Sequence, residues 1–307
     1  MRRKVPIILI FLLFAVGVVI LLYPLISEWH NSRAQTTVIE NYNHAVIGLN
    51  PDEAGAMREA ARAYNEGLLG SVVLTDPFDA GAAKMASEEY EALLNLGGDG
   101  VMGTIRIPKI GVELPIYHGT ATETLEKGAG HLENTSLPIG GTGTHAVLSA
   151  HSGLPAAALF TELIKLTEED LFFLDVLDET LAYRVDQVKV VEPEDTSDLW
   201  IDTNADYVTL VTCTPYGINS HRLLVRGVRT EDVETLEQEA QVEQTPGSPW
   251  NKPYTVAGMI LILLLVLYTI VRLLRRKKGA LPINSVYENT LMDNRKAAYA
   301  AAKKEVL

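Results

Sequence analysis

The sequence predicts a mainly β domain, an antiparallel sheet or barrel, which follows a helical segment and is flanked by two membrane-spanning helices. Beyond Gly100, short stretches rich in β-branched residues alternate with Gly, Pro, Asn and Asp, which is typical of strands joined by turns. An apolar run near each end of the chain has about the 20 residues that a helix needs to cross a bilayer. Between the first of these runs and the β-rich part, the chain is polar and helix-like.

The first apolar run covers residues 5–26 and follows the basic residues 1–4, MRRK. A cleaved signal peptide would have a short apolar core with a small-residue cleavage site close behind it. Here the core is long and continues into SEWHNSRAQ, which has no convincing A-x-A pattern. We therefore interpret the run as a retained transmembrane anchor.

The second apolar run, residues 254–274, is followed at once by RRKK. Basic residues beside a membrane span stay on the cytoplasmic side. Both ends of the chain, residues 1–4 and residues 275–307, are therefore expected in the cytoplasm. The predicted localisation is the cell membrane, with two spans and everything between them outside.

The charge of the chain is unevenly distributed. Of its 26 Lys and Arg and 39 Asp and Glu, 12 basic but only 3 acidic residues lie in the end segments 1–26 and 272–307. The part between them holds 14 basic and 36 acidic residues, a net charge of −22. Such a surface lacks the clustered Lys and Arg that bind phosphate backbones, so nucleic acid is not an expected partner.

Residues 27–96 are expected to form a helical segment outside the membrane. Its first helix ends before Asn50, which caps a second helix that begins at Pro51. An extended piece and a turn at TDPFD, residues 75–79, come next, and a short helix over SEEYEALLNL follows.

Residues 97–230 suffice for one compact domain, and residues 231–253 turn acidic and polar, as expected for a linker that returns to the membrane. One helical insertion is expected between Leu159 and Asp170. The expected strands lie in VMGTIRIPKIGVELPIYHG, HAVLSAHSG, LAYRVDQVKVVE, DYVTLVTC and HRLLVRGVR.

Cys213 is the only cysteine in the chain, so it cannot form an internal disulfide. Outside the membrane, a leftover cysteine is either a reactive thiol or a small buried hydrophobe. Cys213 ends an apolar strand, and after a turn the chain resumes a strand with His221 and Arg222. The sequence predicts a wide hairpin with the thiol at one lip and these two residues at the other.

A histidine or a positive charge near Cys213 would favour loss of the thiol proton. His221 and Arg222 are adjacent on a strand and point to opposite sides, so a regular strand cannot turn both toward the thiol. His151, which ends an apolar strand before a Ser-Gly-Leu-Pro turn, is the best outside candidate, with His221 next. The remaining histidines near predicted strands are His145, further back on the strand of His151, and His118 and His131, both in turn-like contexts.

These motifs resemble the class C, pilus-assembling sortases, which are membrane-anchored cysteine transpeptidases of Gram-positive bacteria. The resemblance runs over residues 71–229 and rests on TLVTC with an arginine nine residues later and on three further blocks, MGTIRIPKIGVELPIYHGT, KGAGHLENTSLPIGG and HAVLSAHSGLP. It implies a closed sortase-type β-barrel with short helices. It also implies that His151 is the acid and base, Cys213 the nucleophile, and Arg222 the group that stabilises the substrate and the oxyanion.

The resemblance further implies the reaction and its partners. The acyl donor would be an LPXTG-like sorting signal, cut between Thr and Gly. The acceptor would be a lysine amine of a pilin subunit, so that the reaction polymerises pili. No cofactor is implied, and no metal, because the chain has no CxxC, HExxH or EF-hand pattern.

The segment TDPFD has two interpretations. An Asp-Pro turn with an aromatic anchor is common in ordinary loops. Class C sortases, however, carry an Asp-Pro-aromatic motif in a lid across the active site, and Asp76, Pro77 and Phe78 match it. The resemblance implies that Asp76 approaches Arg222 and that Phe78 covers Cys213.

The sequence is also compatible with two rival functions. A housekeeping-type sortase would attach proteins to the cell wall, although the DPF segment and the second apolar run disfavour it. A membrane-held binding module would use Cys213 only as core, and alkylation of the thiol would leave its activity intact.

Overall fold

The chain divides into two compact units, Met1–Gly247 and Ser248–Leu307. The computed structural model describes residues 5–68, 74–79, 87–154, 157–231 and 233–242 of the first unit. In the second unit it describes residues 258, 261, 264–269, 272 and 291–296, all of them helical. Most of the second apolar run, residues 254–274, therefore lies outside the described residues.

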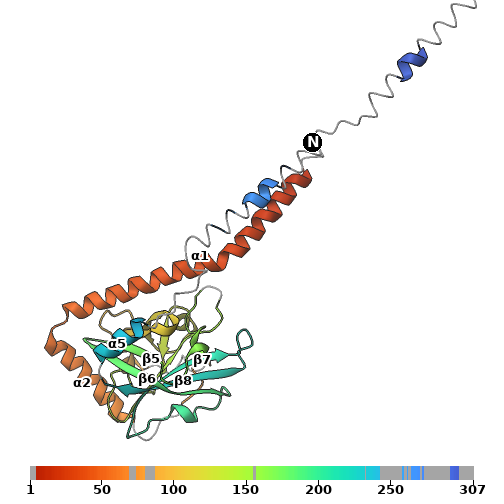
Figure 1. Ribbon diagram of the computed structural model, residues 1–307. Coiled ribbons are helices and arrows are strands. Elements are labelled where there is room, and N and C mark those ends of the chain that lie inside the picture. The colour runs from red at the N-terminus through yellow and green to blue at the C-terminus, as the bar shows by residue number, and fades with distance from the viewer. Residues whose placement is uncertain are drawn as a thin grey trace, which may run out of the picture. The chain divides into compact units, whose positions relative to one another are not determined.

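Eight strands of the first unit form a closed barrel in the order β1-β2-β3-β4-β7-β8-β6-β5 (Figure 1). This confirms the mainly β fold and the closure that the resemblance implied. The strands are β1 (Val101–Ile107), β2 (Val112–His118), β3 (Ala129–His131), β4 (Thr144–Ser149), β5 (Leu171–Val176), β6 (Glu179–Val191), β7 (Asp206–Thr214) and β8 (His221–Thr230).

The barrel is mixed, which corrects the expectation of a purely antiparallel sheet. β2 pairs with β3 and β4 pairs with β7 in parallel, and the other neighbours are antiparallel. Parallel neighbours need a crossover connection rather than a tight hairpin. The chain between β4 and β7 contains β5 and β6, so local hairpin signals could not reveal this pairing.

The expected helix between Leu159 and Asp170 is absent from the described residues there, which hold only the 3-10 turn η3 (Leu163–Lys165). Phe160, Leu163 and Leu166 are buried at a spacing of three, which suits a 3-10 turn better than an α-helix. Two strands were not expected. β3 has only three residues, and β5 begins with four consecutive apolar residues, whose pattern does not distinguish helix from strand.

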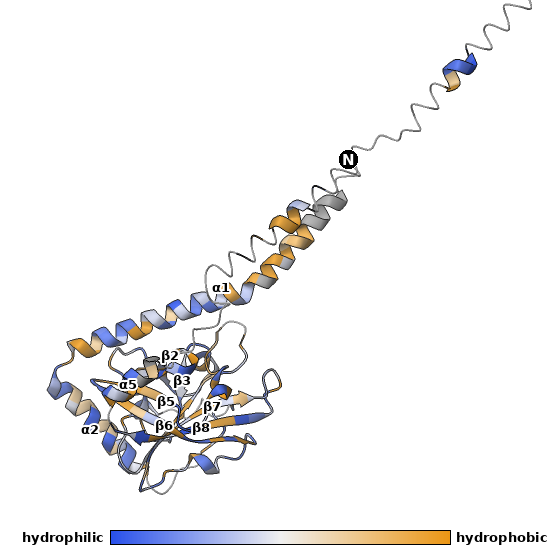
Figure 2. Ribbon diagram, in the orientation of Figure 1, coloured by the Kyte–Doolittle hydropathy of each residue, from blue (hydrophilic) through white to orange (hydrophobic). Residues whose placement is uncertain are grey.

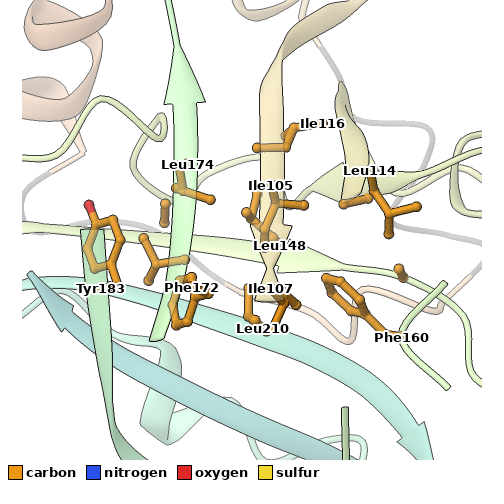
Figure 3. Close-up of a cluster of buried hydrophobic side chains, with 14 of the residues drawn as sticks. Ile105, Ile107, Leu114, Ile116, Leu148, Phe160, Phe172, Leu174, Tyr183 and Leu210 are labelled. Carbon is orange, nitrogen blue, oxygen red and sulfur yellow. The ribbon is translucent and has the colours of Figure 1, made fainter. Parts of the chain in front are cut away.

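The barrel interior is filled by large apolar side chains from most of its strands, as Figure 3 shows. Ile105 and Ile107 come from β1, Leu148 from β4 and Leu210 from β7, and all four are fully buried. Phe160, from the loop after β4, enters the same cluster. This core fixes β4 and β7 side by side, and the candidate site lies at the ends of these two strands.

Helices precede the barrel. α1 (Val5–Gly48) is followed by α2 (Pro51–Gly67), and the side chain of Asn50 accepts a hydrogen bond from the backbone N–H of Glu53 at 2.9 Å, which confirms the predicted cap. The short helices α3 (Glu88–Ala92) and α4 (Thr122–Leu125) lie further along.

The apolar run at the N-terminus and the polar stretch after it form one helix. α1 contains Pro24 without ending there. Apolar residues concentrate in its N-terminal part, whereas the part beyond is mixed (Figure 2). Over Leu12–Gly48, α1 is long and apolar enough to cross a membrane, by length and composition.

The polar half of α1 is docked on the barrel. The hydroxyl of Tyr42 donates to the carbonyl of Met102 at 3.0 Å and accepts from the N–H of Leu177 at 2.8 Å. The side chain of Gln35 donates to the carbonyl of Lys127, just after α4, at 3.0 Å. Tyr42 is buried, and burial raises its pKa to about 12, so the phenol stays neutral.

The segment 231–253, expected as a linker, contains the helix α5 (Val233–Val242). Leu236 and Ala240, four residues apart, are buried against Phe173 of β5 and Ala182 of β6. Glu237 binds Arg106 of β1 at 2.6 Å. The acidic composition hid this narrow apolar stripe.

We predict that Tyr42→Phe lowers the free energy of unfolding by about 1–3 kcal/mol, because it leaves a buried N–H and a buried C=O without their shared partner. Chemical denaturation of the full chain in detergent, followed by circular dichroism, measures this loss. Tyr216→Phe removes the same atom from a tyrosine that is 68% exposed and should change the free energy by less than about 0.5 kcal/mol. Equal effects of the two substitutions would contradict the docking role of Tyr42.

Candidate active site

The hairpin of β7 and β8 places the thiol beside the guanidinium. Cys213 and Arg222 are directly paired across the two antiparallel strands, and their side chains share the outer face of the barrel. Thr214 pairs with His221, one residue further, so the side chain of His221 points to the other face. The sequence-predicted hairpin is therefore present, with Arg222 and not His221 beside the thiol.

The parallel pairing of β4 and β7 brings His151 to the same place. Its register runs from Thr144 with Asp206 to Ser149 with Val211, and the N–H of Ala150 still donates to the carbonyl of Val211 at 3.2 Å. His151 lies two residues beyond the end of β4, and continuation of this register brings it next to Cys213 on the same face. His151 just beyond β4, Cys213 on β7 and Arg222 on β8 thus form one row, which we call the first row.

Backbone contacts fix both ends of the first row. The carbonyl of His151 accepts from the N–H of Phe160, a core residue, at 3.1 Å. Nη1 of Arg222 donates to the carbonyls of Asn219 at 3.2 Å and His221 at 3.1 Å. Asn219 itself has the positive φ of 59° that Asn tolerates in turns. The loop 215–220 therefore aims the guanidinium along the row.

The segment around Asp76 lies over the first row. Oδ1 of Asp76 accepts from Nε of Arg222 at 2.8 Å, and Oδ2 accepts from Nη2 at 2.5 Å, which is the two-pronged pairing that suits a guanidinium. Asp76 also accepts from the N–H of Phe78 at 3.3 Å, and its carbonyl accepts from the N–H of Asp79, which closes a turn around Pro77. The contact between Asp76 and Arg222 that the resemblance implied is present.

Phe78 bridges the two ends of the first row. Its ring centroid lies 5.5 Å from that of His151, and Cζ of Arg222 lies 5.0 Å from the ring centroid. The ring therefore contacts the two residues on either side of Cys213, and Cys213 itself is 8% exposed. Residues 74–79, which we call the lid segment, thus contact both ends of the row.

The lid segment also rests on a small apolar cluster beside the first row. Leu74 and Phe78 are half-buried against it. Its members lie on the outer face of the barrel or in the loops beside it: Leu132, Val147, Val191, Leu199, Val211 and Leu224. Sequence reasoning missed this cluster, although the alternation that places Cys213 on one face of β7 also places Val211 there.

With the lid segment in place, the thiol and the imidazole are both held in their neutral forms. Burial raises the pKa of Cys213, Arg222 opposes this and Asp76 adds to it. Burial lowers the pKa of His151, opposed by the charge of Glu126 at the end of α4. A covering segment that excludes water and neutralises the arginine therefore keeps the nucleophile protonated.

The other histidines considered are placed away from the thiol. His145 is buried between the carbonyl of Trp200 and the hydroxyl of Thr209, and burial lowers its pKa to about 4. His131 is fully buried and accepts from the hydroxyl of Tyr90; it belongs to β3 rather than to a turn. His118 ends β2 and contacts the carbonyls of Gly100 and Leu93.

His221 contacts Ser220 and Glu192 on the far side of the hairpin. Of the histidines weighed from the sequence, His151 alone joins the first row. In the described part of the chain, no three His, Cys, Asp or Glu side chains gather as metal ligands.

The comparisons with known proteins agree with this geometry. A family model described as a sortase domain matches residues 105–230. The sequence of this chain is 47% identical to that of sortase C-1 from Streptococcus pneumoniae. Superposition on the crystal structure of that protein gives a TM-score of 0.60, and the match covers 64% of this chain and 99% of that one. A pilus-related sortase C of Group B Streptococcus is 45% identical, with a TM-score of 0.58, over 63% of this chain and 97% of that one.

Among curated proteins, sortase D of Bacillus subtilis is 31% identical over 130 residues, 41% of this chain and 63% of that protein. The chain thus spans about three fifths of the length of the first curated relatives that it matches.

We predict that Asp76→Ala combined with Phe78→Ala speeds alkylation of Cys213. Loss of the ring exposes the thiol. Loss of the carboxylate removes a negative charge that raises the pKa of Cys213. It also frees Arg222, whose positive charge lowers that pKa. The midpoint of the alkylation rate against pH should therefore fall. At a fixed pH below both midpoints, a thiol pKa that is lower by one unit makes the thiolate fraction about ten times larger. Mass spectrometry after timed exposure to iodoacetamide measures the rate.

Glu168→Ala, at an exposed acidic residue, is the control and should leave the alkylation rate unchanged. If the double variant reacts no faster than this control, the lid segment does not occlude the thiol.

Proposed function

Because the chain belongs to the sortase family, we propose that it is a class C transpeptidase that cleaves an LPXTG-like sorting signal between Thr and Gly and joins it to a lysine amine of a pilin subunit. The observation that carries the proposal is the first row. It combines a lone thiol on β7, a guanidinium on β8 and an imidazole just beyond the end of β4. This set of groups fits acyl transfer through a thioester.

In the first half of the proposed reaction, the thiol proton of Cys213 passes to His151 and the thiolate attacks the carbonyl carbon of the signal's Thr. Negative charge develops on the carbonyl oxygen, and the fixed guanidinium of Arg222 stabilises it. The C–N bond to Gly breaks, and the imidazolium of His151 gives its proton to the departing amine. A thioester on Cys213 remains.

In the second half, a neutral lysine amine of the acceptor attacks the thioester carbonyl. His151 takes the proton that the amine loses, the C–S bond breaks, and an amide replaces the thioester. The thiolate of Cys213 leaves and is available again. The thioester keeps the acyl group activated between the two halves, which permits transfer to an amine rather than loss to water.

The lid segment is proposed to gate this reaction. In the closed arrangement Asp76 occupies the donors of Arg222 that an oxyanion would need, and Phe78 packs between His151 and Arg222, where it is proposed to block access to Cys213. Substrate can bind only when both groups leave, which makes opening a conformational step of the cycle.

The assignment of pilin as the partner is supported by the neighbours. One structure that is 45% identical is described as pilus-related, and another, from Streptococcus pneumoniae and 43% identical, is described in terms of pilin substrate specificity. The contact between Asp76 and Arg222 also favours the pilus-assembling branch over a housekeeping enzyme, because that branch carries the Asp-Pro-aromatic motif.

We propose that the enzyme works at the outer surface of the cell membrane. The apolar part of α1 suits an anchor. The second apolar run, residues 254–274, is proposed as a second span, with the termini 1–4 and 275–307 in the cytoplasm. The basic residues beside both runs support this orientation.

We predict a covalent acyl adduct on Cys213 when the full chain with Asp76→Ala meets an LPXTG peptide. Intact-mass spectrometry should detect an increase equal to the mass of the LPXT fragment minus water, together with release of the Gly-containing fragment. Addition of an amine should discharge the adduct. Arg222→Ala should lower the rate of its formation by about 10²–10³, as expected for loss of an oxyanion-stabilising group.

Cys213→Ala in the same background is the control and should form no adduct. If the lid-opened chain forms none either, and alkylation of Cys213 leaves its other properties intact, the binding-module function replaces the enzyme.

A further inference from the structure

A second row of side chains lies directly behind the first row, on the same outer face of the barrel. It consists of Ser149 on β4, Val211 on β7 and Leu224 on β8, which are paired with one another in the two strand registers. Val211 and Leu224 belong to the apolar cluster on which the lid segment rests. The lid segment therefore covers part of the second row.

Ser149 is the polar member of the second row, and no residue that the structure describes gives its hydroxyl a hydrogen-bond partner. The residue is fully buried, and among the described residues no hydrogen-bond partner meets its Oγ. Most buried hydroxyls are hydrogen-bonded, because an unsatisfied one loses its contact with water without a replacement. The neighbouring buried hydroxyls of Thr212 and Thr135 each donate to a backbone carbonyl, at 2.7 Å and 2.6 Å.

The position of this hydroxyl matches a particular atom of the proposed substrate. Ser149 is diagonal to Cys213 on neighbouring strands, which puts the two residues about 7–8 Å apart and their Cβ atoms somewhat closer. The residue whose carbonyl is attacked is bonded to the sulfur in the thioester, so its side chain starts within a few bonds of Cys213. A side chain of this residue directed toward the second row ends near Ser149.

We propose that Ser149 is a specificity-determining residue whose hydroxyl forms a hydrogen bond with the threonine hydroxyl of the acyl donor. The inference rests on the proposed function and goes beyond it by assigning the selection of Thr at this position to one side chain. With the lid segment closed, the hydroxyl of Ser149 is left unsatisfied. With substrate bound, the threonine hydroxyl replaces the missing partner, while Val211 and Leu224 contact apolar parts of the peptide.

The test is a double-mutant cycle between enzyme and peptide. Asp76→Ala and Asp76→Ala/Ser149→Ala, both as full chains in detergent, are compared on two peptides that differ only in Thr or Val before the scissile bond. Val has nearly the shape of Thr but lacks the hydroxyl. The kcat/KM for transfer to a small amine should favour Thr in the parent, and Ser149→Ala should reduce that preference about tenfold.

The reduction should come from the Thr peptide, since the Val peptide has no hydroxyl for Ser149 to bind. If Ser149→Ala lowers both peptides equally, or leaves the Thr-to-Val ratio unchanged, the proposal is wrong. If the lid-opened parent acylates Cys213 with neither peptide, the proposed function fails and the assignment of Ser149 falls with it. The two failures are therefore distinguishable.

Thermal stability gives a readout that needs no substrate. Ser149→Ala removes an unsatisfied buried hydroxyl and should raise the melting temperature by about 2–4 °C. Ser136→Ala is the matched control, because the hydroxyl of Ser136 is fully buried too but accepts from the N–H of His145 at 3.0 Å. It should lower the melting temperature and leave the Thr-to-Val ratio unchanged. A loss of stability in Ser149→Ala would mean that the hydroxyl has a structural partner and would overturn the proposal.

Discussion

The register between β4 and β7 is the constraint on which the candidate site depends. These strands are far apart in the sequence and run parallel, so no turn fixes how they align. Their alignment is set instead by the core side chains that they bury, such as Leu148 and Leu210 (Figure 3). A slip of one residue would turn His151 away from Cys213 and move apolar residues from the core to the outer face. Packing inside the barrel therefore determines chemistry outside it.

The ion pair between Asp76 and Arg222 is the second determining interaction. The two side chains are only 15% and 11% exposed, so neither can lose its partner without cost unless another group or water replaces it. An arriving carbonyl oxygen can replace the carboxylate on the guanidinium. The lid segment is also held by a turn within itself and by apolar contacts through Leu74 and Phe78. This combination suits a covering segment that is displaced by exchange of partners rather than by unfolding of the barrel.

Much of this arrangement follows from the sequence, and the exceptions have physical reasons. The hairpin of β7 and β8 was predicted because it is local, but the sequence left open whether His221 or Arg222 faces Cys213, and the strand register decides for Arg222. Choosing His151 over His221 depended on the family resemblance, since the parallel neighbour of β7 is not visible in the sequence pattern. The buried hydroxyl of Ser149 was missed, because only packing reveals whether a polar atom finds a partner. The acidic segment that contains Leu236 was taken for a linker because composition outweighed a two-residue apolar stripe.

The continuity of α1 has a geometric consequence. If its apolar part is anchored in the bilayer as proposed, the same continuous helix connects the membrane to the barrel and fixes the distance between them. From Ile26, at the end of the apolar run, to Gln35, which donates to the carbonyl of Lys127, the rise is about 14 Å. At that distance the thiol would lie close to the lipid surface, where membrane-tethered substrates arrive by diffusion in the plane of the membrane. The length of α1 between the membrane and the barrel would then help to determine which membrane-tethered chains can place a segment at Cys213.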